Sequence, residues 1–181
     1  MRKLGLALTL TLLSAFSASA DIIDGSLGIT TFGATLGGGS DLSTATTMTP
    51  TVLLTGGASG DFTAIPDGTP GTGGVVNLNN LGSFVIDFGS FGYFSSTSGQ
   101  IVDRNANFLK VIYSGNYSGL GTFDLSPVTF RVSMTYSSNG NSTAPTFASY
   151  GGTLASPVPE PSSYALFGLG LGGLFALRRL R

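Results

Sequence analysis

Residues 128–136 alternate strictly between apolar and polar side chains, and this period of two constrains the fold more than any other feature of the chain. The apolar positions are Val128, Phe130, Val132, Met134 and Tyr136. In an extended strand they all point to one side, so one face should contact a core and the other solvent. The Ser- and Asn-rich run 137–142 contains Asn-Gly and favours a turn, after which residues 146–154 should return antiparallel.

Shorter extended runs precede this strand, separated by Gly, Ser, Asn and Asp, and none has a helical period. They lie at residues 27–34, 46–54, 75–78, 83–88, 91–94 and 107–114. Regular strands with turn signals between them are typical of antiparallel sheets without crossover helices. We therefore expect an all-β domain over residues 21–156, an antiparallel β-sandwich of the Greek-key or jelly-roll kind, with a largely aromatic core.

Two of these runs indicate which side chains face inward. In the run 83–88 the inward set should be Phe84, Ile86 and Phe88. In the run 107–114 the pattern leaves two alternatives open. Those alternatives are Leu109, Val111 and Tyr113 on one side, or Phe108 and Ile112 on the other. The segments 37–47 and 64–74 are rich in Gly, with Ser and Thr or with Pro, and should be loops.

The composition excludes several kinds of chemistry. Eight basic and nine acidic residues make up only 9% of the 181-residue chain, and there is no His, Cys or Trp. Without them there is no Ser-His-Asp or Cys-His machinery, no imidazole or thiolate ligand for zinc, and no disulfide. General acid and base catalysis would depend on Asp residues alone, because the single Glu160 lies in a linker. We expect a protein that is not an enzyme.

The first twenty residues have the three parts of a secretory signal peptide. Arg2 and Lys3 precede the uncharged, largely apolar stretch 4–16, and small residues follow at Ala18 and Ala20. A basic start, an apolar centre and an A-x-A exit predict cleavage by signal peptidase before Asp21, after export through the secretion translocon. A buried core helix is the alternative, but it would have no reason to combine a basic start with this exit.

The other end of the sequence also combines an apolar segment with basic residues. Residues 164–177 carry no charge and are followed by Arg178, Arg179 and Arg181, a basic tail over 178–181. As a helix the segment would be about 21 Å long against a hydrocarbon core of about 30 Å, a short transmembrane helix. Basic residues at both ends favour the cytoplasm, which places residues 21 to about 160 outside. Four glycines count against the alternative of a buried core helix.

The segment 157–163 joins the domain to this helix and contains Pro159, Glu160 and Pro161. Pro-Glu-Pro, a Gly-rich apolar helix and an Arg cluster, in this order, resemble the PEP-CTERM sorting signal of Gram-negative bacteria. The resemblance implies recognition by a membrane-embedded exosortase and cleavage near Pro-Glu-Pro. It implies secretion, surface attachment or association with extracellular polysaccharide, as in a biofilm. Beside the resemblance, we interpret the three arginines as the stop of a transient inner-membrane anchor.

Calcium is the metal that the acidic residues could hold, because it prefers carboxylate and carbonyl oxygens. Asp61 and Asp67 flank one loop and are the favoured pair, with Asp21, Asp24 and Asp41 as further candidates. The alternative is that these aspartates only cap turns. No EF-hand spacing is present, and we expect no cofactor beyond such a structural calcium ion.

Exposed tyrosines could stack on sugar rings, and the candidates are Tyr93, Tyr113, Tyr117 and Tyr150. The alternative, which we favour for most of the aromatic residues, is a place in the buried core. Asn116 and Asn141 stand in N-glycosylation sequons. Nucleic acid is not expected as a partner, because the basic residues of the domain are only Arg104, Lys110 and Arg131. We interpret the chain as an exported protein of the cell envelope, outer surface or extracellular matrix with a structural or interaction role. The alternative is a carbohydrate- or calcium-binding surface module.

Overall fold

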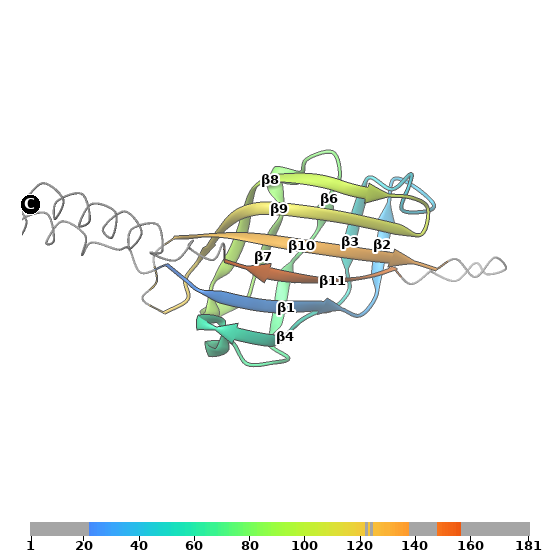
Figure 1. Ribbon diagram of the computed structural model, residues 1–181. Coiled ribbons are helices and arrows are strands. Elements are labelled where there is room, and N and C mark those ends of the chain that lie inside the picture. Colours follow the sequence, from blue (N-terminus) through green and yellow to red (C-terminus); the bar gives the residue numbers. More distant parts are fainter. Residues whose placement is uncertain (1–21, 122, 124, 138–147, 157–181) are drawn as a thin grey trace, which may run out of the picture.

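A computed structural model describes residues 22–121, 123, 125–137 and 148–156 (Figure 1). Within these residues the chain forms eleven strands and three short 3-10 helices, with no α-helix. The strands are β1 (Gly25–Thr31), β2 (Ala34–Gly37), β3 (Thr47–Pro50), β4 (Leu53–Gly60), β5 (Pro70–Gly73), β6 (Val76–Asn77), β7 (Val85–Asp87), β8 (Tyr93–Arg104), β9 (Phe108–Ser118), β10 (Ser126–Tyr136) and β11 (Ala148–Ala155). The 3-10 helices are η1 (Asp61–Ala64), η2 (Leu81–Ser83) and η3 (Gly89–Phe91).

Eight strands form a closed antiparallel barrel, so the predicted β-sandwich is wrong although the all-β, antiparallel class is confirmed. The order around the barrel is β1-β11-β10-β9-β8-β7-β5-β4. Closure depends on β1, which pairs with β11 on one side and with β4 on the other. A sandwich of the Greek-key or jelly-roll kind would leave strand edges unpaired, whereas a closed barrel has none. Both folds bury one face of every strand, so the alternation is the same in each.

The barrel curves at β-bulges, where one strand has an extra residue relative to its partner. One bulge lies between Ser26 and Gly28 opposite β4, and β8 has two opposite β9. Gly28 is paired with Gly56, and a Cβ atom at Gly28 would collide with the Gly56 carbonyl oxygen. Glycine at this bulge therefore lets the two backbones approach closely where the sheet closes on itself.

The interior of the barrel is filled by stacked aromatic rings. The ring centroids of Phe84 and Tyr113 lie 4.4 Å apart in a stacked arrangement, and Phe130 stacks on Phe84 at 5.5 Å. Gly99 is the cross-strand partner of Tyr113, and a Cβ atom there would lie 2.9 Å from the Tyr113 ring. A missing side chain on one strand thus makes room for a large ring on the next. The barrel interior is a packed core.

The predicted core positions are largely confirmed. Val128, Phe130, Val132 and Met134 are buried, while Tyr136 at the end of β10 is half-buried. The run 83–88 buries its expected set, Phe84, Ile86 and Phe88. Of the two alternatives for 107–114, the structure buries Leu109, Val111 and Tyr113. The predicted turn at 137–142 lies, apart from Ser137, outside the described residues.

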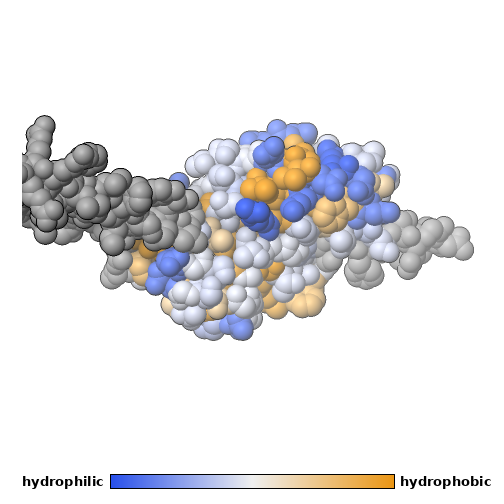
Figure 2. All heavy atoms as spheres, viewed as in Figure 1, coloured by the Kyte–Doolittle hydropathy of each residue, from blue (hydrophilic) through white to orange (hydrophobic). Residues whose placement is uncertain are grey.

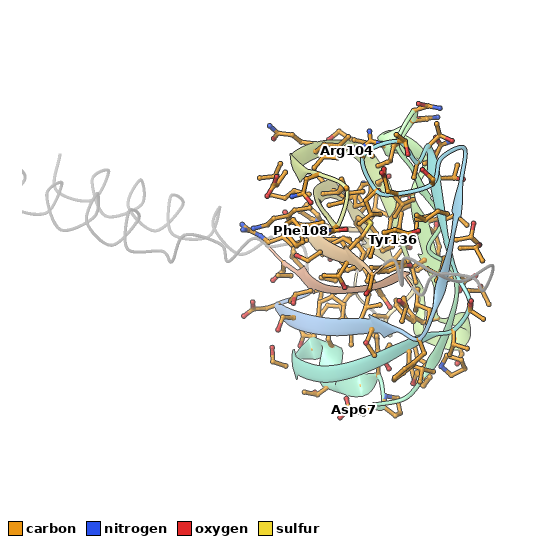
Figure 3. All side chains as sticks on the ribbon, turned by 90° about the vertical axis from the view of Figure 1, so that its right-hand side faces the viewer. Asp67, Arg104, Phe108 and Tyr136 are labelled. Carbon is orange, nitrogen blue, oxygen red and sulfur yellow. The ribbon has the colours of Figure 1, made fainter. Side chains whose placement is uncertain are left out.

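The smaller sheet β2-β3-β6 lies at the end of the barrel that Figure 3 turns toward the viewer. The segment 38–46 between β2 and β3 is fixed there by side chains of the barrel. Arg104 donates from Nε to the Leu42 carbonyl oxygen at 2.8 Å and from Nη2 to that of Ala45 at 2.6 Å. Tyr136 donates its hydroxyl hydrogen to the Ser40 carbonyl oxygen at 2.7 Å. This segment is a loop, as expected.

The surface is poor in charge. The chain contains 44 Ser and Thr and 28 Gly against 17 charged residues. Much of the face in Figure 2 is accordingly pale, the colour of intermediate hydropathy, and its most strongly coloured hydrophobic patch lies over β8 and β9. Val102, which is 50% exposed on β8, belongs to the exposed hydrophobic side chains. The polar surface is therefore made largely of hydroxyl and backbone groups.

Candidate functional site

The barrel holds the residue that immediately precedes the Pro-Glu-Pro segment. Ser156 donates its backbone N–H to the Gly25 carbonyl oxygen at 3.1 Å, and its Oγ accepts the Gly25 N–H at 3.1 Å. The same hydroxyl donates to Asp24 Oδ1 at 3.3 Å. We call this the tether end of the barrel, defined by Asp24, Gly25 and Ser156 (Figure 1). Residues 22–25 and 156 are thus joined at one end, so the sorting segment starts at a fixed point on the barrel.

The sorting and export residues themselves lie outside the described residues. This concerns the predicted sorting motif, the basic residues after the apolar segment, and the signal-peptide cleavage site. They are Pro159, Glu160, Pro161, Arg178, Arg179, Arg181, Ala18, Ala20 and Asp21. Their roles stay predictions, as do the boundaries at 1–20, 157–163, 164–177 and 178–181. Among the helices that are described, none has the length and apolar character needed to cross a membrane.

Asp61 and Asp67 each accept a backbone N–H from a neighbouring segment. Asp61 Oδ2 accepts the N–H of Asp24 at 2.8 Å, and Asp67 Oδ1 accepts the N–H of Gly57 at 2.9 Å. Figure 3 shows Asp67 at the edge of the barrel beside β4. These bonds are those of turn-capping carboxylates. Nowhere in residues 22–121, 123, 125–137 and 148–156 do three or more Asp, Glu, His or Cys side chains form a group that could hold a metal ion.

Asp41 also caps a turn. Its Oδ1 accepts the hydroxyl hydrogen of Ser43 at 2.7 Å and that of Thr44 at 2.9 Å. These two hydrogen bonds, that of Ser43 first, lower the pKa of the Asp41 carboxyl below its usual range. Asp24 lies at the tether end, where its Oδ1 accepts the Ser156 hydroxyl. Every candidate calcium ligand in the described part of the chain is therefore already engaged by protein hydrogen-bond donors.

Three of the four candidate tyrosines cannot stack on a sugar, because they are inside the barrel. Tyr113, Tyr117 and Tyr150 are at most 2% exposed, and burial raises the pKa of each phenol above its usual value. The Asp87 carboxylate adds to the increase in the pKa of Tyr117, and Tyr113 adds to that of Tyr150. Their interior placement agrees with the alternative that most of the aromatic residues belong to the core, and it excludes these three as sugar-stacking residues. Tyr93 differs, since it is 44% exposed on the outer face of β8.

The Tyr117 and Tyr150 hydroxyls have hydrogen-bond partners, whereas the Tyr113 hydroxyl has none among the described residues. Tyr117 donates to the Phe91 carbonyl oxygen at 2.9 Å, and Tyr150 donates to that of Gly74 at 2.8 Å. The Tyr113 oxygen is buried without a partner in this part of the chain. Two tyrosines therefore fix loops to the barrel, and the third is held by packing alone.

Comparison with known families gives one finding. The model of the PEP-CTERM protein-sorting motif matches residues 157–180. The chain carries a PEP-CTERM protein-sorting motif. This motif implies recognition by an exosortase and an exported, membrane-associated protein. Searches of the curated proteins and of the solved structures gave no match. The barrel holds Ser156, and the matched motif begins at the next residue.

The sequence analysis did not name Asp87 as a candidate site residue. Asp87 stands between the buried Ile86 and Phe88 and therefore points outward. Strand β5, whose residues 70–73 were expected to be loop, was also missed. β5 places Thr72 beside Asp87, because these two residues are partners in the pairing of β5 with β7. The alternation within 83–88 already indicated that Asp87 points outward. The residues beside Asp87 on neighbouring strands could not be predicted, because they depend on which distant strands pair with β7.

Proposed function

We propose that this protein is an exported surface or matrix component of the cell envelope that an exosortase sorts and processes, and whose barrel has a non-enzymatic structural or interaction role. The observation that carries the proposal is the position of the motif. It begins at residue 157, and Ser156 is bonded to the first strand of a closed barrel. The sorting motif therefore follows directly after the last barrel residue that the structure describes.

The spacing would keep the barrel close to the membrane while the anchor is in place. Seven residues, 157–163, separate Ser156 from the apolar segment 164–177. A fully extended chain of this length spans at most about 25 Å. From the sequence alone we expect Pro159 and Pro161 to disfavour a helix in this segment and to favour an extended backbone. In our proposal Pro159, Glu160 and Pro161 are recognised by the exosortase at a constant depth, and Arg178, Arg179 and Arg181 stop the anchor on the cytoplasmic side.

Export would begin with the signal peptide. In our proposal the translocon exports the chain and signal peptidase cleaves after Ala20, which makes Asp21 the first residue of the mature protein. Removal of the terminal basic residues then leaves three basic against nine acidic residues up to position 163. The exported barrel would be moderately acidic, with a hydroxyl-rich surface suited to remaining soluble in an extracellular matrix.

The test replaces Pro159, Glu160 and Pro161 with Ala and compares the size and location of the protein in a host that has the matching exosortase. We expect the unaltered protein to be shortened and to reach the outer envelope or the medium, whereas the variant keeps its full C-terminal segment and stays in the inner membrane. Ser162→Ala together with Ser163→Ala is the matched control and should behave as the unaltered protein. Identical size and location of the triple variant would contradict the proposal.

A further inference from the structure

A row of polar side chains crosses four neighbouring strands on the outside of the barrel; Thr72, Asp87 and Tyr93 are exposed, and Ser118 is half-buried. Thr72 on β5 is paired with Asp87 on β7, Asp87 with Tyr93 on β8, and Tyr93 with Ser118 on β9. Cross-strand partners point to the same face of a sheet. Adjacent strands are about 4.8 Å apart, so the row extends over roughly 14 Å. This is longer than one sugar ring and suits an extended chain of rings.

A shallow groove adjoins this row, and residues of β5 and η3 line it. Its volume is about 380 Å³, and its lining includes Thr69, Thr72, Asp87, Ser90 and Phe91. Phe91 is half-buried, so part of its ring forms an apolar wall, and Tyr93 stands two residues further along the chain beside Asp87. The groove and the adjoining row together thus combine a carboxylate and several hydroxyls with the rings of Phe91 and Tyr93.

Hydrogen bonds fix the backbone of the groove walls, one from a buried side chain and two within residues 87–92. The buried Tyr117 donates its hydroxyl hydrogen to the Phe91 carbonyl oxygen at 2.9 Å. Asp87 Oδ1 accepts the Gly89 N–H at 2.7 Å, and the Gly92 N–H returns to the Gly89 carbonyl oxygen at 3.1 Å. A groove fixed in this way loses little conformational entropy when a ligand binds.

The remaining polar atoms of the row are available to a ligand. Oδ2 of Asp87 and the hydroxyls of Thr72, Tyr93 and Ser118 make no hydrogen bond to any residue that the structure describes. The basic side chains in the same described ranges are Arg104, Lys110 and Arg131, and none of them lines the groove or belongs to the row. An anionic ligand would meet only the negative charge of Asp87, which disfavours phosphate, sulfate and uronate groups.

We propose that this groove, together with the adjoining row in which Asp87 is paired with Tyr93, binds a neutral polysaccharide. A pyranose ring has an apolar C–H face, which packs on an exposed aromatic ring, and a rim of hydroxyls. Asp87 Oδ2 accepts hydrogen bonds from these hydroxyls, and charge-assisted bonds of this kind are about twice as strong as neutral ones. Thr72, Ser90 and Ser118 can both donate and accept. This activity goes beyond the proposed sorting and does not depend on it, because it belongs to the barrel alone.

The experiment is affinity electrophoresis of the full chain, purified in a mild detergent, through native gels that contain dextran, soluble starch or hydroxyethylcellulose. We expect at least one of these neutral polysaccharides to retard the protein, and alginate, a polyuronate, to leave its mobility unchanged. Tyr93→Ala and Asp87→Asn should each weaken the apparent affinity at least about tenfold, as for a residue at the centre of a binding site. Asp87→Asn keeps an oxygen that can accept the Gly89 N–H.

Two control variants lie away from the groove. Val102→Ala removes an apolar side chain that is 50% exposed, and Asp103→Asn removes an exposed carboxylate; both residues lie near the end of β8, far along the strand from Tyr93. Both should keep the retardation of the unaltered protein, and circular dichroism melts verify that each variant is folded. The proposal is overturned if none of the three neutral polysaccharides retards the protein, if alginate retards it equally, or if the Tyr93 and Asp87 variants bind like the controls.

Discussion

Replacement of Tyr113 by Phe should make the protein more stable, although it removes a polar group from the centre of the barrel. The Tyr113 ring is fully buried and stacks on Phe84 with centroids 4.4 Å apart, and Phe preserves this packing. The hydroxyl oxygen has no hydrogen-bond partner among the described residues. In the unfolded chain the same hydroxyl is bonded to water, so folding removes its hydrogen bonds without replacement.

The size of the effect follows from the cost of an unpaired buried hydroxyl, about 1–3 kcal/mol. Removal of the oxygen leaves a small void, which reduces the expected increase in the free energy of unfolding. We therefore expect Tyr113→Phe to raise the free energy of unfolding by about 1 kcal/mol, which for a domain of this size raises Tm by about 3–5 °C.

The matched control removes the same atom from Tyr150, whose buried hydroxyl donates to the Gly74 carbonyl oxygen at 2.8 Å. Tyr150→Phe loses this bond and should lower the free energy of unfolding by about 1–2 kcal/mol. Thermal unfolding of the full chain in detergent, followed by far-ultraviolet circular dichroism, measures both variants. The two changes should have opposite signs. A Tyr113 variant that loses as much stability as the Tyr150 variant would refute the reasoning, because its hydroxyl would then be bonded in the folded protein.

Three further results are expected. Between about pH 7 and pH 10 the free energy of unfolding from denaturation curves should be constant, and above pH 10 it should fall. Burial raises the pKa of Tyr113, Tyr117 and Tyr150, so the unfolded chain loses these protons first; no decrease by pH 11 would contradict this. Chelation of calcium should leave Tm unchanged, since the candidate ligands Asp24, Asp41, Asp61 and Asp67 already accept protein hydrogen bonds; a lower Tm that calcium restores would count against that view. Arg104→Lys should lower the free energy of unfolding by about 1–2 kcal/mol and speed proteolysis within residues 38–46, because an ammonium cannot reproduce both hydrogen bonds of the guanidinium. An unchanged cleavage rate would show that these bonds do not fix the loop.

The core was largely predictable because side-chain direction in a strand depends only on the local backbone. Phe84, Ile86 and Phe88 follow the alternation and are all buried. The same rule could have separated the tyrosines. Tyr113 and Tyr117 share the parity of Leu109 and Val111 and therefore point inward with them.

Barrel closure was not predictable from the alternation. It depends on β1 pairing with both β4 and β11, and Leu27 meets Leu154 across 127 positions of the sequence. Strand β5 consists of Pro, Gly, Thr and Gly, residues with little intrinsic preference for a strand apart from Thr. Its pairing with β4 and β7 holds it extended. The groove beside β5 could not be predicted either, because it depends on contacts between segments that are distant in the sequence.

The measurement that tests the account most directly is the intact mass of the protein recovered from the outer envelope or the medium of a host with the matching exosortase. Our account predicts a mass that lacks residues 1–20 and also lacks the apolar segment 164–177 with the basic tail 178–181, while the barrel up to Ser156 is retained. A mass that still contains Arg178, Arg179 and Arg181 in the exported protein would contradict it.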